Sequence, residues 1–381
     1  MIYADYNATA PMRPEARDAV LMALALGAAN PSSVHQSGRA ARAVVEKARG
    51  QIGGAVGSRA ADILFTSGGT ESLALAIQGA VLALDGQATL IVSAIEHEAA
   101  SKAAAYAGVP VETAYVGTDG RVDLADLGAR LAAWDRDLKG TPILVLMLAN
   151  NETGILQPVA EAAALVRAAG GLTVCDAVQA FGKVQVNAAL LGADYIALSA
   201  HKIGGPQGVG ALWHRAGAPL KALQYGGGQE RGLRSGTENV AGIAGFGAAA
   251  EAAVRDLPKY AALAKPRDAM EARLKAEGGV TVIGEGSPRL AGTSNFARPN
   301  FRAETQVMAL DLAGVCVSAG SACSSGKVKR SLVLLAMGAD DALAESAIRT
   351  SFGWDTKPED FERVADAWLE AARRTVLKET V

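Results

Sequence analysis

The sequence is poor in cysteine, has no long apolar run and carries almost no excess charge. Its 381 residues include three cysteines, Cys175, Cys316 and Cys323. These are too few and too scattered for a disulfide framework or a zinc site. No apolar run approaches the roughly 20 residues of a membrane-spanning helix. With 37 Lys and Arg against 39 Asp and Glu, the formal net charge is -2, which gives no electrostatic reason to expect a nucleic acid or membrane partner.

The first residues, MIYADYNATAP, contain the acidic Asp5 and no basic region followed by an apolar core. This pattern does not resemble a secretory signal. We therefore expect a soluble cytoplasmic protein in which any thiol chemistry belongs to one residue.

Short β-rich apolar runs alternate with longer Ala-rich helical patterns, as is typical of a parallel sheet covered by helices. The runs are nearly continuous in apolar character, which favours strands buried on both faces. They cover residues 63–66, 89–95, 143–149, 172–175, 195–198 and 209–213. The predicted fold class is α/β, a mostly parallel sheet sandwiched by helices.

A second, smaller α+β domain is predicted for the C-terminal third. The helical pattern between residues 240 and 274 is interrupted by Pro258 and Pro266, which are poorly tolerated inside a helix, and we place a domain boundary there. Beyond it lie strand-like pieces at 280–283 and 314–318 and helical patterns at 331–335 and 358–377.

Lys202 follows the strand-like run 195–198 and precedes a glycine-rich turn. A partly desolvated lysine at a strand end can have an amine pKa low enough to form a Schiff base with a carbonyl compound. Most lysines at strand ends are solvated surface charges instead. The interpretation therefore depends on what the neighbouring strands carry.

Four other strands end in polar groups, and ligands of open α/β sheets bind beyond the carboxyl ends of strands. The first run is followed by Ser67-Gly-Gly-Thr70 at a predicted helix start, an arrangement suited to phosphate but also common in ordinary helix caps. The others end in His97, in Asn151, and in Asp176 with Gln179; the fifth run leads to Ser199, His201 and Lys202. Singly, His97 and Asp176 could be caps and Asn151 a turn former. Together, an anion site, a flat ring, a carboxylate and an amine match pyridoxal phosphate.

Eight motifs, in order, resemble the cysteine desulfurases of the NifS/IscS type, within the class V aminotransferase family. The resemblance runs from about Tyr3 to about Thr356. The motifs are FTSGGTES, EHEAA, NNETG, DAVQAFGK, SAHKIGGPQGVGAL, GGGQERGLRSGTEN, SAGSACSSG and IRTSFG. Trp354 departs from the family pattern, in which an arginine is common after the last motif.

The resemblance implies a fold type I pyridoxal phosphate enzyme that works as a homodimer. Its large domain would span residues 13–257, and its small domain residues 1–12 plus 258–381. Lys202 would form the Schiff base, His97 would stack on the ring and assist proton transfers, Asp176 would hold the pyridine nitrogen protonated, and Gln179 would contact the ring hydroxyl. The phosphate would be bound by Thr70, Ser199 and His201, with Thr237 reaching it from the other subunit. Gly69 and Asn151 would also bind the cofactor. The substrate L-cysteine would be held by Asn7, Asn151 and Arg349.

Cys323 is the candidate nucleophile. Cys175 lies inside an apolar run and Cys316 between two valines, so both are interpreted as core residues. Cys323 stands among small polar residues followed by Lys327, Lys329 and Arg330, and nearby cations stabilise a reactive thiolate. On its own it could be an incidental loop thiol. Beside a pyridoxal site, we expect it to take the substrate's sulfur as a persulfide, on a mobile loop of about residues 318–330, for a sulfur-acceptor or iron-sulfur scaffold protein. It is also the one candidate for transient ligation of an iron-sulfur cluster.

Other functions remain open for this sequence. A selenocysteine lyase, or another class V lyase or aminotransferase, would use the same pyridoxal site, although the SAGSACSSG motif favours desulfuration. A non-catalytic module that keeps the cofactor pocket is a more distant alternative, because every expected functional position is filled.

Overall fold

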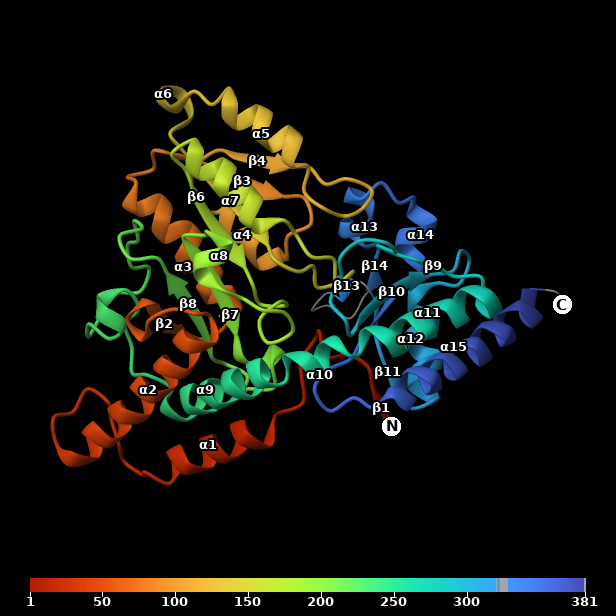
Figure 1. Ribbon diagram of the computed structural model, residues 1–381, viewed down its shortest axis with the longest axis horizontal. Helices are drawn as coiled ribbons and strands as arrows, with labels where there is room; N and C mark the ends of the chain where they lie inside the picture. The colour runs from red at the N-terminus through yellow and green to blue at the C-terminus, as the bar shows by residue number, and fades with distance from the viewer. Residues whose placement is uncertain (320, 323–327, 380–381) are drawn as a thin grey trace.

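A central sheet forms the larger part of the molecule (Figure 1) in the computed structural model, which describes residues 1–319, 321–322 and 328–379. Seven of the described strands build it in the order β2-β8-β7-β6-β5-β3-β4. They are β2 (Ile63–Thr66), β3 (Ala88–Ser93), β4 (Val111–Ala114), β5 (Thr141–Met147), β6 (Leu172–Asp176), β7 (Tyr195–Ser199) and β8 (Gly210–His214). Strand β8 is antiparallel to both of its neighbours, and the other pairs are parallel. The predicted mostly parallel sheet is confirmed.

Helices cover both faces of this sheet. Successive residues of its strands point to opposite sides, and both sets of side chains are apolar and packed against helices. Ile63 and Phe65 belong to one apolar cluster, together with residues of α2, α7 and α9, whereas Leu64 belongs to another, with residues of α3 and α4. The helices of this region are α1 (Pro14–Leu24), α2 (Gln36–Ala55), α3 (Gly69–Ala83), α4 (Glu98–Ala105), α5 (Leu124–Ala132), α6 (Arg136–Lys139), α7 (Val159–Ala168), α8 (Ala188–Leu191) and α9 (Val240–Arg255). The near-continuous apolar runs are explained by burial on both faces.

The helical pattern after residue 240 divides into separate helices where the sequence predicts an interruption. Helix α9 ends at Arg255 and is followed by α10 (Leu257–Ala261) and α11 (Ala264–Gly278). Pro258 is the second residue of α10 and Pro266 the third of α11. In the first turn of a helix the missing N–H of proline removes no intrahelical hydrogen bond.

The C-terminal third builds a separate antiparallel sheet in the order β12-β15-β10-β9. Its strands and the neighbouring short strands are β9 (Thr281–Val282), β10 (Thr293–Ala297), β11 (Val315–Cys316), β12 (Ser318–Ala319), β13 (Ser321–Ala322), β14 (Val328–Lys329) and β15 (Ala347–Ser351). The helices are α12 (Ala303–Leu312), α13 (Leu332–Ala336), α14 (Asp341–Ser346) and α15 (Pro358–Glu379). Strand β1 (Ile2–Tyr3) pairs in parallel with β11, so the N-terminus lies beside this third of the chain (Figure 1).

The N-terminal segment connects the two regions and reaches the loop that carries Lys202. Its Tyr6 N–H donates to Ser351 O, and further along Ala10 N–H donates to His201 O and Arg13 N–H to Gly204 O. Trp354 holds the same segment, because its indole Nε1 donates to Pro11 O at 3.0 Å.

Trp354 also lies against the Arg13 guanidinium, which is 5.2 Å from the ring centroid. Arg13 in turn forms a 2.6 Å ion pair with Asp256. These contacts explain how the tryptophan that departs from the family pattern is accommodated: it fixes the segment that precedes α1.

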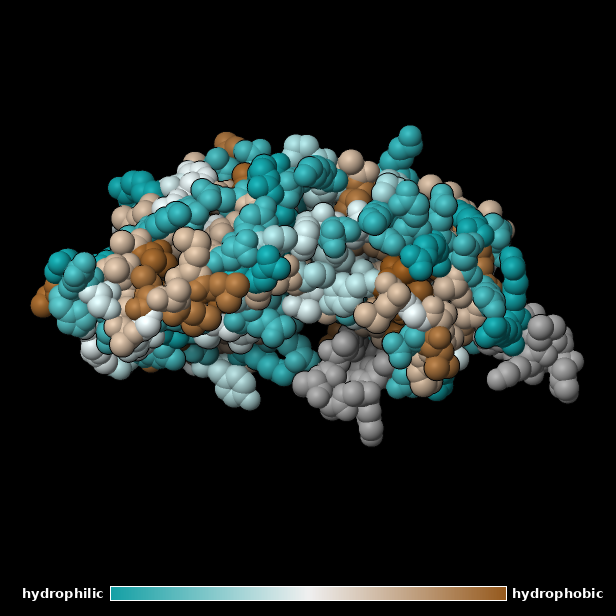
Figure 2. Space-filling model, turned by 90° about the horizontal axis from the view of Figure 1, so that it is seen from below, coloured by the Kyte–Doolittle hydropathy of each residue, from teal (hydrophilic) through white to brown (hydrophobic). Residues whose placement is uncertain are grey.

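Apolar surface gathers at the end of the molecule where α1 lies, at the left in Figure 2. The large apolar side chains exposed on α1 are Leu21, Met22 and Leu24, each more than half exposed. Among the residues that the structure describes, no helix combines the length and the apolar character required to cross a membrane.

Candidate active site

The carboxyl ends of β2, β3, β5, β6 and β7 meet at a cavity of about 490 Å³. It is closed on the far side by the N-terminal segment and by residues of β12, α13 and β15. Most of the site residues predicted from the sequence line this cavity. They are Asn7, Gly69, Thr70, His97, Asn151, Asp176, Gln179, Ser199, His201, Lys202 and Arg349.

Lys202 ends a short 3-10 turn that continues directly from β7. Its Nζ donates to Asn7 O at 2.6 Å and to Ala8 O at 2.8 Å. Burial, followed by the positive charge of Arg349, lowers the pKa of its amine from 10.5 to about 8. The amine is thus closer to its neutral, nucleophilic form near neutral pH than an exposed lysine would be.

Asp176 is the last residue of β6 and is buried at the floor of the cavity. Its Oδ1 accepts the Val178 N–H at 2.9 Å. Burial raises the pKa of this carboxyl, and the neighbouring His97 and Lys202 act in the opposite direction. A cationic group bound beside it would favour the ionised form.

His97 follows β3 and both caps a helix and lines the cavity. Its Nδ1 accepts the Ala99 N–H at 3.1 Å in the first turn of α4. An accepting Nδ1 places the proton of a neutral ring on Nε2. His97 is thus a helix cap, and its position in the cavity wall leaves it available for the role expected from the sequence.

Gly69 and Thr70, which are expected near the phosphate, begin α3, whereas Ser199 and His201 follow β7 in the wall of the same cavity. Gly68 caps this helix, and Gly69 and Thr70 are its first two residues, where backbone N–H groups have no intrahelical acceptor. A Cβ at Gly69 would lie 2.6 Å from Val178 Cγ2, so glycine permits close packing against the segment after β6. On the same side, burial and then Lys202 lower the pKa of His201 to about 4, which leaves a neutral imidazole.

Arg349 on β15 presents its guanidinium to the cavity from the C-terminal sheet. Its Nη1 donates to Asn151 O at 2.9 Å and its Nη2 to Asp5 Oδ1 at 2.7 Å. Its Nε is buried without a partner among the described residues. A buried guanidinium with an unused N–H is suited to a carboxylate ligand.

Two carboxyl groups in the cavity wall are absent from the sequence prediction. Glu96 Oε1 accepts the Met147 N–H at 2.7 Å, while Oε2 has no partner among the described residues. Burial, then the charge of Asp176, raises the pKa of Glu96 well above its usual value. Burial likewise raises the pKa of Glu152 to about 7. Both lie inside the EHEAA and NNETG motifs, so a signal existed, but nothing in sequence shows burial of a carboxyl.

The structure does not bring every predicted residue to this cavity. Thr237 lines a separate small cavity with Glu230 and Arg234. Cys323 lies outside the described residues. Cys175 is buried, as predicted, whereas Cys316 is only partly buried, because its strand β11 lies in a two-stranded sheet with β1.

The groups that surround the cavity fit pyridoxal phosphate. The helix start with Thr70 suits its phosphate, the buried Asp176 its protonated ring nitrogen, and the amine of Lys202 its aldehyde. The fit rests on complementary chemistry, since burial displaces the pKa values of Asp176 and Lys202 toward their neutral forms and the cofactor would supply a cationic nitrogen for the first and an aldehyde for the second.

Comparison with known proteins extends this similarity over almost the whole chain. The family model described as aminotransferase class-V matches residues 2–364. The chain is 38% identical over 371 residues to the cysteine desulfurase IscS of Dictyoglomus turgidum, covering 96% of this chain and 93% of the relative. It is 40% identical over 365 residues to a cysteine desulfurase of Cereibacter sphaeroides, covering 94% and 92%. The crystal structure of a NifS-like protein from Rickettsia africae superposes with a TM-score of 0.89 at 33% identity, covering 98% and 99% of the two chains.

Proposed function

The chain belongs to the class V aminotransferase family, and we propose that it is a pyridoxal phosphate-dependent cysteine desulfurase that converts L-cysteine to L-alanine and passes the sulfur to Cys323. The observation that carries the proposal is the meeting of Lys202, Asp176 and Arg349 in one cavity. The similar proteins named as cysteine desulfurases favour this reaction over a selenocysteine lyase, an aminotransferase or a non-catalytic module.

In this proposal the cofactor is held by the residues at the strand ends. Thr70, Ser199 and His201 bind its phosphate beside Gly69, His97 stacks on its ring, Gln179 contacts its ring hydroxyl and Asp176 pairs with its ring nitrogen. Lys202 attaches it covalently. When bound, pyridoxal phosphate supplies an electron sink for the α-carbon of an amino acid.

Arg349 would orient L-cysteine by its carboxylate, with Asn151 and Asn7 beside it. The planar guanidinium can donate two parallel hydrogen bonds to a carboxylate, and Nη1 and Nη2 each make one hydrogen bond in the structure, which leaves each a second N–H. The Lys202 Nζ would take the proton from the substrate's Cα, because its lowered pKa suits a general base. His97 Nε2 would assist the proton transfers.

Sulfur transfer balances without an external oxidant. The Cβ–S bond of L-cysteine breaks, and a new S–S bond forms with the Cys323 thiolate. The carbon skeleton leaves as L-alanine after Cβ gains one proton in place of the sulfur and Cα regains the proton that it lost. Cys323 would then hold a persulfide for an acceptor protein. The metal role open to Cys323 is transient ligation of an iron-sulfur cluster.

The oligomeric state, the domain division and the cellular location belong to the same proposal. We propose a homodimer in which Thr237 reaches the partner's phosphate site; the apolar side chains exposed on α1 are surface that a second copy could cover. The division into residues 13–257 and residues 1–12 plus 258–381 follows the two sheets. We place the protein in the cytoplasm, because the role proposed for Cys323 requires a free thiol, and thiols persist in reducing compartments.

Replacing Cys323 tests the proposed sulfur carrier. Cys323→Ala should keep the cofactor absorbance and lose most persulfide formation and alanine release from L-cysteine. Cys316→Ala, at a partly buried cysteine outside the proposed site, is the matched control and should retain both. Unchanged persulfide output from Cys323→Ala would exclude this residue as carrier, and a keto acid in place of alanine would indicate transamination.

A further inference from the structure

Lys183 is a buried lysine that the proposed function does not use. It follows Gln179 by four residues in the turn after β6, a spacing that places the two side chains on one side. Its Nζ donates to Gln179 Oε1 at 2.8 Å and to Asn7 Oδ1 at 2.7 Å. All three side chains are at least nine-tenths buried. Lys183 therefore joins two amides that line the active-site cavity without lining that cavity itself.

The number of donors on Lys183 matches these two acceptors. Burial lowers the pKa of its amine well below 10.5, and the positive charges of Lys202 and Arg349 lower it further. A neutral primary amine has two N–H groups, and the side chain makes two hydrogen bonds. Lys183 can thus orient both amides, and the lowered pKa favours the uncharged amine beside Lys202.

The hydrogen bond from Lys183 Nζ to Gln179 Oε1 fixes the orientation of the Gln179 amide. An amide has one acceptor end and one donor end, and Lys183 occupies the acceptor end. The donor end, Nε2, makes one hydrogen bond among the described residues, to Asn7 O at 2.7 Å. Its second N–H is left for a ligand in the cavity that Gln179 lines.

We propose that Lys183 is a positioning residue that holds Gln179 with its N–H toward the cofactor's ring oxygen. The inference rests on the cofactor role proposed for Gln179. A donor stabilises an anionic ring oxygen, whereas the opposite amide orientation would present a carbonyl oxygen to it. Without Lys183 the Asn7 O contact alone favours this orientation of Gln179, so the opposite orientation becomes less costly.

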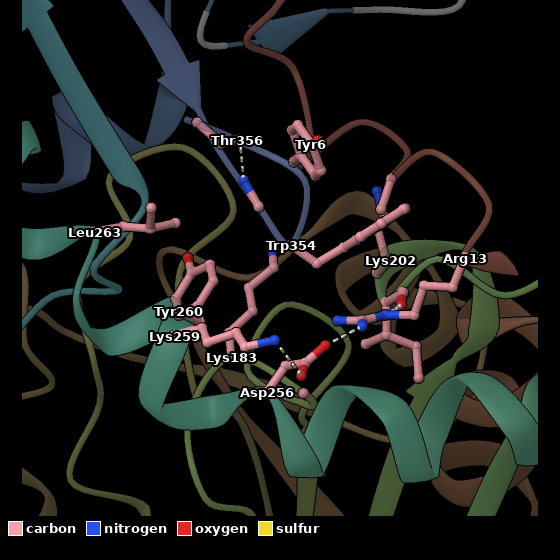
Figure 3. A pocket seen from close by; sticks show the side chains of 14 residues that line it. Tyr6, Arg13, Lys183, Lys202, Asp256, Lys259, Tyr260, Leu263, Trp354 and Thr356 are labelled. Carbon is pink, nitrogen blue, oxygen red and sulfur yellow. Dashed lines mark hydrogen bonds and ion pairs between the residues drawn. The ribbon is translucent and has the colours of Figure 1, made fainter. Parts of the chain in front are cut away.

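A second, smaller cavity lies on the other side of Lys183 and supplies a matched control. It has a volume of about 150 Å³, and Lys183, Lys202 and Lys259 line it together with Asp256 and Trp354 (Figure 3). Lys259 has the same side chain, but it is 79% exposed and pairs with Asp256 at 3.4 Å. Lys259→Met thus removes a lysine from the same cavity without touching either amide.

The test measures cofactor binding, so its outcome is independent of whether L-cysteine is the substrate. Lys183→Met should raise the Kd for pyridoxal phosphate roughly tenfold, equivalent to about 1.4 kcal/mol, and shift the absorbance of the bound cofactor. Lys259→Met should change neither. In a Gln179→Leu background, Lys183→Met should have no further effect on the Kd, because the amide that it orients is gone.

Two results would overturn the proposal. The first is an unchanged Kd for pyridoxal phosphate in Lys183→Met. The second is that Lys183→Met weakens cofactor binding as much in the Gln179→Leu background as in the wild type, because a purely structural role would not depend on Gln179. Lys183→Gln, which keeps an N–H donor on a shorter side chain, allows the same comparison if Lys183→Met does not fold, and a smaller but equally Gln179-dependent effect is expected. If the wild-type protein shows no desulfurase activity, the proposed function is refuted. The comparison of cofactor Kd values between variants remains valid in that case.

Discussion

Substitution of Glu152 by glutamine is expected to stabilise the protein above neutral pH. Glu152 Oε2 accepts the Ser331 hydroxyl at 2.5 Å. Burial raises the pKa of the carboxyl from 4.5 to about 7, against the opposing effects of the Ser331 hydrogen bond and the positive Arg349. Glutamine has nearly the same size and accepts the same hydrogen bond, but it does not ionise. It therefore removes the cost of a buried charge.

The size of the effect follows from the two pKa values. Because the folded pKa is the higher one, the contribution of Glu152 to stability is fully present below about pH 4.5 and is lost as pH rises through 7. The difference between 4.5 and about 7 corresponds to about 3 kcal/mol over the whole window. About 1 kcal/mol of this is lost between pH 6 and pH 8.

Urea unfolding of wild type and Glu152→Gln at both pH values measures this change. The variant's stability relative to wild type should increase by about 1 kcal/mol from pH 6 to pH 8. Glu251→Gln, at an exposed carboxylate that accepts a hydrogen bond from Gln51, should show the same difference from wild type at both values. An equal difference for Glu152→Gln at pH 6 and pH 8 would refute the reasoning, because it would mean that Glu152 does not titrate in this range.

Two further predictions concern the amine and the guanidinium of the site. The rate at which apoprotein takes up pyridoxal phosphate covalently should rise about tenfold per pH unit below pH 8 and level off above it, because Lys202 has a pKa of about 8; absorbance after rapid mixing measures this rate, and a rate that still rises steeply beyond pH 9 would indicate an unperturbed amine. Arg349→Lys should raise the KM for L-cysteine by roughly 10- to 100-fold, about 1.4 to 2.8 kcal/mol, with a smaller change in kcat, because an ammonium cannot make the two parallel hydrogen bonds. Steady-state alanine formation measures both constants, and an unchanged KM would remove Arg349 from the substrate site.

The residues at the strand ends could be predicted from the sequence, because each depends on only a short stretch of neighbouring residues. Each buried strand of the main sheet is an apolar run, and the polar residue that follows it is carried to the same edge by the parallel arrangement. Edge strand β4 and strands β10 and β15 of the C-terminal sheet were not predicted, whereas β9 lies within the predicted strand-like piece 280–283. Strand β10, for example, buries Ser294 and Asn295, so it lacks the apolar pattern on which the prediction depends.

The contacts that support the site could not be predicted in the same way. The hydrogen bond between Glu152 and Ser331 joins distant parts of the chain, as does the one between Lys183 and Asn7. Neither pair has a spacing that sequence periodicity could reveal. The pKa shifts of these groups depend on burial, which appears only when the N-terminal segment and the C-terminal sheet close over the strand ends.

Burial gives the site a common electrostatic character. It is the largest cause of the raised pKa values of Glu96, Glu152 and Asp176 and of the lowered values of Lys183, His201 and Lys202. Acids and bases are thus both displaced toward their neutral forms. A ligand that brings a cationic ring nitrogen to Asp176 and an anionic phosphate to the start of α3 restores the balance for the groups it contacts. Lys183, Glu96 and Glu152 have no such partner in the proposed complex, so their pKa values should stay displaced in the same directions when the cofactor binds. Their hydrogen bonds to amide, backbone and hydroxyl groups then orient the site without pairing with the cofactor's charges.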